Sequence, residues 1–268
     1  MKYKMIVMDI DGTLTTDNKI ISQRTKAALT YAQKKGIIIA LASGRPPEGM
    51  KQFSQQLEME KHHGILLAFN GGSVLDAQSK QKIYEKSIPL DRAKAMLKHL
   101  ENFPVTPFVF QGSYIYSSDK NGYKVEYERS VSGLKTKEIY PMAEKLDFSP
   151  VKIVSAAPHD ILVSVRDKIM EPFEKEFTFI MAAPDYLDCN RKGISKGDTL
   201  VKICKSLHIS LDEVIAFGDE QNDLSMIKYA GLGIAMGNAC KELKEVADEI
   251  TLSNNEDGIV AILEKYLN

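Results

Sequence analysis

Short runs of apolar residues, with helix-forming stretches between them, dominate the first 70 residues of the chain. The apolar runs are Met5–Met8, Ile37–Ala42 and Ile65–Phe69, and helical spacing covers Ser22–Lys35 and Pro47–Glu60. A strand that is apolar at every position has to be covered on both of its faces, and a parallel sheet flanked by helices provides that cover. This pattern predicts a doubly wound α/β fold.

The same alternation of helix and strand returns in the last third of the chain. The patterns follow one another at Lys196–Leu207, Val214–Phe217, Asn222–Ala230 and Leu232–Ala235. Two such stretches, separated by a long segment of another kind, are typical of an α/β domain that carries an insertion.

The segment between them has a different pattern. Stretches such as "PFVFQGSYIYSSD" and "SPVKIVSAAP" alternate, and helical stretches at Leu90–Leu100 and His159–Lys168 lie among them. Alternation of apolar and polar residues is typical of an antiparallel sheet with one solvated face. We therefore expect an α/β core formed by residues 1–82 and 191–268, with an inserted α+β domain at residues 83–190.

Composition and charge argue against several classes of protein. The 268 residues carry a formal net charge of −1, so no overall field attracts the chain to nucleic acid or to an anionic membrane. No apolar run approaches the ~20 residues that span a bilayer, and the N-terminus shows no signal segment. The three cysteines are widely spaced, as expected for reduced thiols. We expect a cytoplasmic protein without a nucleic-acid or membrane partner; the sequence does not indicate its oligomeric state.

Polar side chains gather where the predicted parallel strands end or where a helix begins. The candidates are Asp9, Asp11, Ser43, Gly44, Arg45, Lys196, Asp219, Asn222 and Asp223. In an open α/β sheet, ligands bind at the carboxyl ends of the strands, where helix N-termini also point. The four separate stretches that carry these residues therefore predict one site.

The residue types in this site are those of phosphoryl transfer. Two carboxylates ~4 Å apart repel by about 4 kcal/mol at an effective dielectric of ~20, and a hard cation such as Mg²⁺ removes that penalty. A phosphate is bound by positive charge and by hydrogen-bond donors. The sequence offers the Lys196 ammonium, the Ser43 hydroxyl and backbone amides in loops that contain glycine. An aspartate near its ordinary pKa of ~3.9 is ionised at pH 7 and can attack phosphorus, and a second acid nearby can move the proton.

Four motifs in the chain resemble those of the haloacid dehalogenase-like phosphatases. "DIDGTLTT" is similar to the first motif of that family, "LASGR" to the second, "KGISKGDTL" to the third and "FGDEQNDLSMI" to the fourth. Their order and spacing, together with "FNGG", resemble the Cof-type subfamily of sugar phosphatases, which has an α/β cap between the second and third motifs. The resemblance spans the whole chain, and four motifs in order are far more specific than one.

The resemblance implies a role for each matching residue. Asp9 would be the nucleophile that forms an aspartyl-phosphate, and Asp11 the general acid and base. The metal would be held by the Asp9 carboxylate, the Asp11 backbone carbonyl and Asp219, with Asp223 acting mainly through water. The groups that would meet the transferring phosphoryl are Ile10, Asp11, Ser43, Gly44, Lys196 and Asn222. In the second motif serine replaces the usual threonine and keeps its hydroxyl, and "NGG" replaces the commoner NGA.

Plainer interpretations exist for the same residues. Asp9 and Asp11 could form a strand-end turn, Lys196 could be a solvated lysine at a helix start, and Asp219 could cap a helix. We favour the catalytic interpretation over these alternatives, because four motifs occur together in the order typical of the family. Arg45 stays open between a substrate contact and a salt bridge.

The function that we predict is Mg²⁺-dependent hydrolysis of small phosphorylated metabolites, sugar phosphates first, through an aspartyl-phosphate. A cap over the core should exclude bulk water and read the leaving group. One alternative is a phosphotransferase such as a sugar phosphomutase, which uses the same chemistry. The other is a non-catalytic phosphosugar sensor, against which the Asp9–Asp11 pair argues because binding alone needs no proton shuttle.

Overall fold

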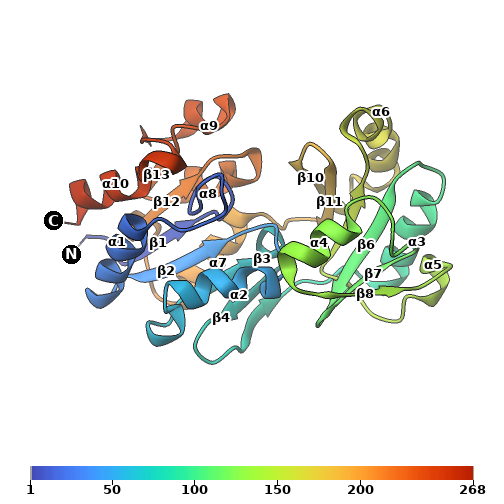
Figure 1. Ribbon diagram of the computed structural model, residues 1–268, viewed down its shortest axis with the longest axis horizontal. Helices are drawn as coiled ribbons and strands as arrows, with labels where there is room; N and C mark the ends of the chain where they lie inside the picture. Colours follow the sequence, from blue (N-terminus) through green and yellow to red (C-terminus); the bar gives the residue numbers. More distant parts are fainter. Residues whose placement is uncertain (1, 268) are drawn as a thin grey trace. The chain divides into compact units, whose positions relative to one another are not determined.

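The structure of the chain, a computed structural model, describes residues 2–267 and divides into two compact units (Figure 1). Unit 1 comprises the chain up to Tyr84 and from Ser195 onward, and unit 2 comprises Glu85–Ile194. The chain leaves unit 1 once and returns to it once, so unit 2 is an insertion in sequence.

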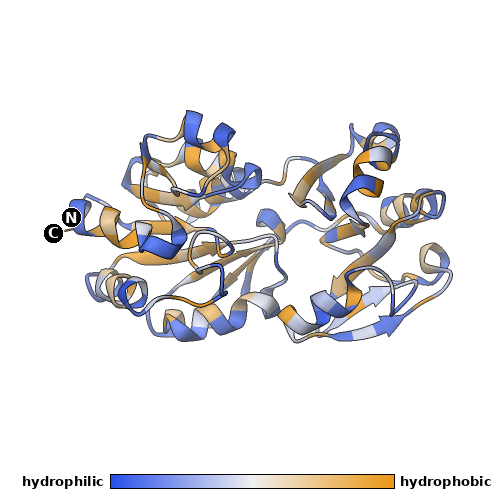
Figure 2. Cartoon of the chain, turned by 45° about the horizontal axis from the view of Figure 1, so that its top comes forward, coloured by the Kyte–Doolittle hydropathy of each residue, from blue (hydrophilic) through white to orange (hydrophobic). Residues whose placement is uncertain are grey.

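Unit 1 is built on a mostly parallel sheet. Over residues 2–267 this sheet has eight strands in the order β14-β13-β12-β1-β2-β3-β4-β5. The parallel strands are Met5–Met8 (β1), Ile38–Ala42 (β2), Ile65–Ala68 (β3), Val214–Gly218 (β12), Leu232–Ala235 (β13) and Glu249–Ile250 (β14). Every residue of β1, β3, β12 and β13 is buried, and Figure 2 shows the apolar character of these central strands. The predicted doubly wound α/β core is confirmed.

Two strands at one edge of this sheet were not predicted. Ser73–Asp76 (β4) pairs antiparallel with β3, and Lys82–Glu85 (β5) follows it at the edge. Both strands have only four residues, and β5 is largely exposed. Such short segments with little apolar periodicity give a sequence pattern too weak to distinguish a strand from a loop.

Within residues 2–267, unit 1 has six α-helices. They are Gln23–Lys34 (α1), Pro47–Gln56 (α2), Lys196–Ser206 (α7), Leu224–Tyr229 (α8), Lys241–Val246 (α9) and Gly258–Tyr266 (α10). Serine side chains cap α1 and α7: Ser22 accepts a hydrogen bond from the Thr25 amide, and Ser195 accepts one from the Asp198 amide. The predicted helix Asn222–Ala230 begins instead as a 3₁₀ turn at Gln221–Asp223, before α8.

Unit 2 contains a sheet that is mostly antiparallel. Within Glu85–Ile194, all of it described, the strand order is β10-β11-β9-β6-β7-β8. The strands are Thr106–Gln111 (β6), Tyr114–Ser117 (β7), Lys135–Glu138 (β8), Lys152–Ala156 (β9), Phe177–Ala183 (β10) and Tyr186–Arg191 (β11). The β7–β8 pair is parallel, because the helix Val125–Ser132 (α4) carries the chain back between the two strands. Neither α4 nor β8 was predicted from the sequence.

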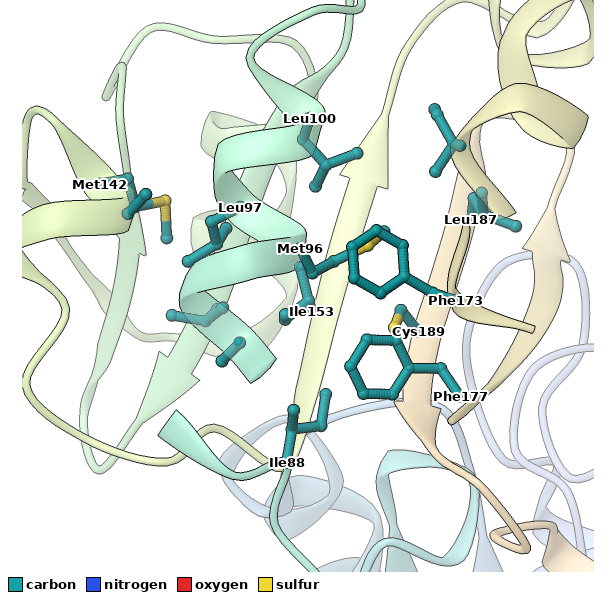
Figure 3. Close-up of a cluster of buried hydrophobic side chains, with 14 of the residues drawn as sticks. Ile88, Met96, Leu97, Leu100, Met142, Ile153, Phe173, Phe177, Leu187 and Cys189 are labelled. Carbon is teal, nitrogen blue, oxygen red and sulfur yellow. The ribbon is translucent and has the colours of Figure 1, made fainter. Parts of the chain in front are cut away.

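The other helices of unit 2 are Leu90–Leu100 (α3), Met142–Lys145 (α5) and His159–Met170 (α6). Figure 3 shows Met96 and Leu97 of α3 with Ile153 of β9 and the rings of Phe173 and Phe177, which belong to one buried apolar cluster. This cluster gives unit 2 a hydrophobic core of its own.

Between residues 2 and 267, no helix is both long enough and apolar enough to cross a membrane.

Candidate active site

Two aspartates from distant parts of the chain meet because their strands are neighbours. Asp9 directly follows β1 and Asp219 directly follows β12, and these strands pair in parallel, with Met8 opposite Phe217. Asp223 joins them from the following 3₁₀ turn. One carboxylate oxygen from each of the three aspartates lies within 4.8 Å of the others, and all three residues are buried. This spacing allows one cation to be shared.

Lys196 supplies positive charge to this cluster from the first turn of α7. Its side chain is fully buried, and its Nζ donates to Asp9 Oδ1 at 2.6 Å and to Asp223 Oδ1 at 2.5 Å. Burial alone would lower the pKa of Lys196, but the two carboxylates raise it above its ordinary value. The residue is therefore a charged ammonium, and its interpretation as a solvated helix-start lysine is wrong.

The remaining negative charge is not compensated by the protein. Burial raises the pKa of Asp9 to about 7 even though Lys196 acts to lower it, and burial with the nearby Asp9 charge raises the pKa of Asp219 to about 8. From the sequence we expected an ordinary pKa for Asp9, and this prediction is wrong for the protein without a cation. Buried carboxylate oxygens with too little positive charge are the donors that Mg²⁺ prefers, so the residues fit this ion.

Asp223 is held more firmly than the other two carboxylates. Its Oδ2 accepts the backbone amides of Asp219 at 3.0 Å and Glu220 at 3.1 Å, while its Oδ1 accepts Lys196. Both oxygens are thus engaged within the protein. This arrangement orients the backbone at Asp219 and the Lys196 ammonium.

The loop after β1 closes tightly on Asp219. Thr13 Oγ1 donates to Asp219 Oδ1 at 2.6 Å, and the Asn238 side-chain amide donates to the Gly12 carbonyl at 2.8 Å. Gly12 has φ +83°, and a Cβ atom at this position would lie 2.2 Å from Asp219 Oδ2. Glycine is required here on both grounds, since a side chain would strain the backbone and displace the carboxylate.

Asp11 points into a separate cluster of positive charge. Arg45 Nε donates to its Oδ2 at 2.7 Å, Arg45 Nη2 to its Oδ1 at 2.8 Å, and Lys19 Nζ to its Oδ1 at 2.9 Å. Although burial acts to raise the pKa of Asp11, these contacts lower it to about 2. Of the two interpretations left open for Arg45, the structure shows the salt bridge. Lys19 was missed, because nothing in its spacing relates it to the site.

The loops after β2 and β3 are joined through Asn70. The Asn70 amide donates to the Ser43 carbonyl at 2.9 Å, and its Oδ1 accepts the side-chain amide of Asn222 at 3.1 Å. Asn70 is fully buried and has φ 57°, a left-handed conformation that asparagine tolerates better than most residues. The sequence motif "FNGG" did not reveal this role of Asn70, although an asparagine before two glycines is a signal for a left-handed turn.

The other predicted phosphate-binding positions lie in the same loops. The Ser43 hydroxyl accepts the Arg45 amide at 3.2 Å, and Gly44 lies between these two residues after β2. Ile10 is fully buried, and its carbonyl accepts both the amide and the hydroxyl of Thr15, each at 2.9 Å. Because β1 and β2 pair in parallel, with Met8 opposite Leu41, these residues follow neighbouring strand ends at the same edge of the sheet.

Comparison with known proteins gives consistent results along the whole chain. A sequence profile described as haloacid dehalogenase-like hydrolase matches residues 6–263. A Haemophilus influenzae protein provisionally named a phosphatase is 32% identical over 266 residues, covering 99% of this chain and 98% of its own. The Bacillus subtilis 5-amino-6-(5-phospho-D-ribitylamino)uracil phosphatase YcsE is 28% identical, covering 98% of this chain and 96% of its own. A crystal structure of a haloacid dehalogenase-like hydrolase from Bacteroides thetaiotaomicron superposes with a TM-score of 0.91 at 32% identity, covering 98% and 99% of the two chains.

Proposed function

Because the chain belongs to the haloacid dehalogenase-like hydrolase family and is a phosphatase of that family, we propose that it is a Mg²⁺-dependent phosphatase of small phosphorylated metabolites. Sugar phosphates are the first candidates. The observation that carries this proposal is the convergence of Asp9, Asp219 and Asp223 within 4.8 Å beside a buried lysine.

In the proposed reaction the Asp9 carboxylate attacks the phosphorus of the substrate. The P–O bond to the leaving group breaks, Asp11 gives a proton to the leaving oxygen, and an aspartyl-phosphate remains on Asp9. Asp11 then takes a proton from water as the water attacks phosphorus, which releases inorganic phosphate and restores Asp9. The Asp9 and Asp219 carboxylates and the Asp11 carbonyl would hold Mg²⁺, with Asp223 acting through water. When bound, the ion offsets the negative charges of the Asp9 carboxylate and the substrate phosphate, which otherwise repel each other.

The surroundings of Asp11 favour its ionised form, which bears on its role as an acid. With a pKa of about 2, held down by Arg45 and Lys19, its carboxyl group carries no proton at neutral pH. Loosening of these two ion pairs when substrate binds would raise the pKa of Asp11, because burial then acts without their opposing effect. The carboxylate as it stands is suited to the second step, in which it accepts a proton.

The phosphoryl group would be recognised by donors that border the aspartate cluster. These are the backbones at Ile10, Asp11 and Gly44, and the side chains of Ser43, Lys196 and Asn222. A fixed ammonium, a hydroxyl and amide donors match the oxygens of a phosphate.

The choice of substrate is assigned to the inserted domain, predicted at residues 83–190. The relative YcsE is named as a phosphatase whose substrate carries a phosphate ester on a ribityl group. This name supports a small polyol phosphate as the substrate class of this chain. We place the enzyme in the cytoplasm, without nucleic-acid or membrane partners.

A panel of phosphorylated metabolites tests the proposal, with phosphate release measured in Mg²⁺ and in EDTA. Asp9→Asn should abolish turnover, and Asp11→Asn should slow it by about 10²–10⁴-fold. Asp212→Asn, which changes an exposed carboxylate of the same unit, should leave turnover unchanged. Activity that persists in EDTA or in Asp9→Asn contradicts the proposal, and dependence on a bisphosphate primer would favour the phosphomutase instead.

A further inference from the structure

Unit 2 contains a cavity whose lining residues have no role in the reaction steps described above. Its volume is about 380 Å³, and all eight of its lining residues belong to unit 2. Five of them are basic: Lys86, Arg92, Lys175, Arg191 and Lys192. Glu176 is the acidic member of the lining, in a chain whose formal net charge is −1. Such a local excess of cations creates a positive potential that attracts anions.

Only part of this positive charge is neutralised. Glu176 is fully used by Arg92, whose Nε and Nη2 donate to its two oxygens at 2.6 and 2.5 Å. The Lys192 ammonium donates to the neutral carbonyl of Glu174 at 2.9 Å and so keeps its net charge. Lys175 and Arg191 are exposed, and their side chains have no partner among residues 2–267. The cavity therefore offers a lysine and an arginine that are ready to bind a ligand.

A helix terminus adds a second source of positive potential. Pro89 lines the cavity and is the N-cap of α3, an 11-residue helix, and no side chain caps this end. The first amides of a helix have no partner within it and carry the positive end of the helix dipole. Phe177, a member of the apolar cluster of Figure 3, forms part of the wall. Basic side chains, a helix N-terminus and an apolar residue thus line one hollow.

We propose that this cavity binds a small organic anion carrying a phosphate group. The planar guanidinium of Arg191 suits two phosphate oxygens at once, and Lys175 supplies a point charge. A volume of about 380 Å³ lies within the range of small-molecule sites and exceeds what a bare ion fills. The residues that line the cavity differ from those of the aspartate cluster, because none of them belongs to unit 1.

The cavity also lies where the chain enters and leaves unit 2. The unit begins at Glu85 and ends at Ile194, and Lys86 Nζ donates to the Lys192 carbonyl at 2.8 Å. A ligand in the cavity would therefore contact residues near both ends of unit 2, such as Lys86 and Lys192. Such a ligand could be a phosphorylated metabolite or the free phosphate that the enzyme releases.

Backbone amide NMR of the full-length protein tests this proposal. The labelled chain, held in EDTA so that esters are not hydrolysed, is titrated with inorganic phosphate and separately with glucose 6-phosphate, against sodium chloride at equal ionic strength. We expect saturable shifts at the amides of Leu90, Phe177 and Lys192. Tighter binding of the ester would identify a metabolite site, and equal binding would identify a phosphate site.

Two variants and a matched control locate the binding. Lys175→Gln and Arg191→Gln should each weaken it by about tenfold. Lys168→Gln removes an equally exposed charge from α6 in the same unit and should change it less than twofold. Shifts that do not saturate, that occur only in the loops of the aspartate cluster, or that survive Arg191→Gln unchanged would overturn the proposal. The same spectra show that each variant is folded.

Discussion

Substitution of Gly12 by alanine tests how closely the first loop fits the aspartate cluster. Gly12 has φ +83°, and Gly36 has nearly the same conformation, φ +85°. A Cβ at Gly12 would lie 2.2 Å from Asp219 Oδ2, whereas a Cβ at Gly36 meets nothing within 4 Å. Gly36→Ala is therefore a matched control, in which the backbone strain is the same and the steric clash is absent.

The size of each effect follows from this geometry. A left-handed alanine costs about 1–2 kcal/mol, so both variants should lose a few degrees in Tm. Only in Gly12→Ala must the Asp219 carboxylate also move, by about 1 Å, to reach an acceptable contact distance. Mg²⁺ demands near-ideal geometry at ~2.0–2.1 Å, so this shift should weaken its binding by about 10–100-fold.

The measurement is phosphate release as a function of Mg²⁺ concentration, together with Tm for both variants. We expect the Mg²⁺ activation constant to rise in Gly12→Ala and to stay at the wild-type value in Gly36→Ala. Equal activation constants in the two variants would refute the reasoning, because the displaced Asp219 would then have no part in holding the metal.

Two further predictions concern the charges of the site. Without metal, the folded state keeps protons on Asp219 and Asp9 that the unfolded chain releases above pH ~4, so the free energy of unfolding should fall as pH rises from about 4 to about 8. Asp219→Asn should flatten this slope and be more stable than the wild type above pH 8, by about 1–3 kcal/mol in urea denaturation with EDTA; a less stable variant contradicts the charge repulsion. Arg45→Gln should raise the pKa of Asp11 from about 2 toward or above its ordinary value, followed by ¹³C titration of the carboxyl group; an unchanged titration would mean that the salt bridge does not form.

Much of the fold could be predicted because buried strands and helix faces consist of apolar residues, and these patterns are visible in the sequence. The strands Met5–Met8 and Leu232–Ala235 and the helix Leu90–Leu100 have the predicted bounds. Strands covered on both faces must be apolar throughout, and this is visible without any partner. The edge strands β5 and β8, and β4 beside β5, show no such apolar run in the sequence, since their faces are partly solvated.

The positions of polar residues directly after predicted strands and at a helix start likewise indicated which residues gather at one edge of the sheet. The structure brings Asp9, Asp219 and Lys196 together as expected, because parallel neighbours present their carboxyl ends side by side. The roles of these residues in catalysis stay predictions.

Only the tertiary structure decided the protonation and the partners of these groups. The pKa of Asp9 depends on its burial, which raises it to about 7. The sequence does not show how deeply Asp9 is buried. Asp11 forms ion pairs with Arg45 and Lys19. Hydrogen bonds also link Asn70 to Ser43 and to Asn222. Several of these contacts join residues far apart in the chain. The sequence by itself determined where apolar strands and charged groups occur. Distances between charges, which set their electrostatic energies, exist only once the chain has folded.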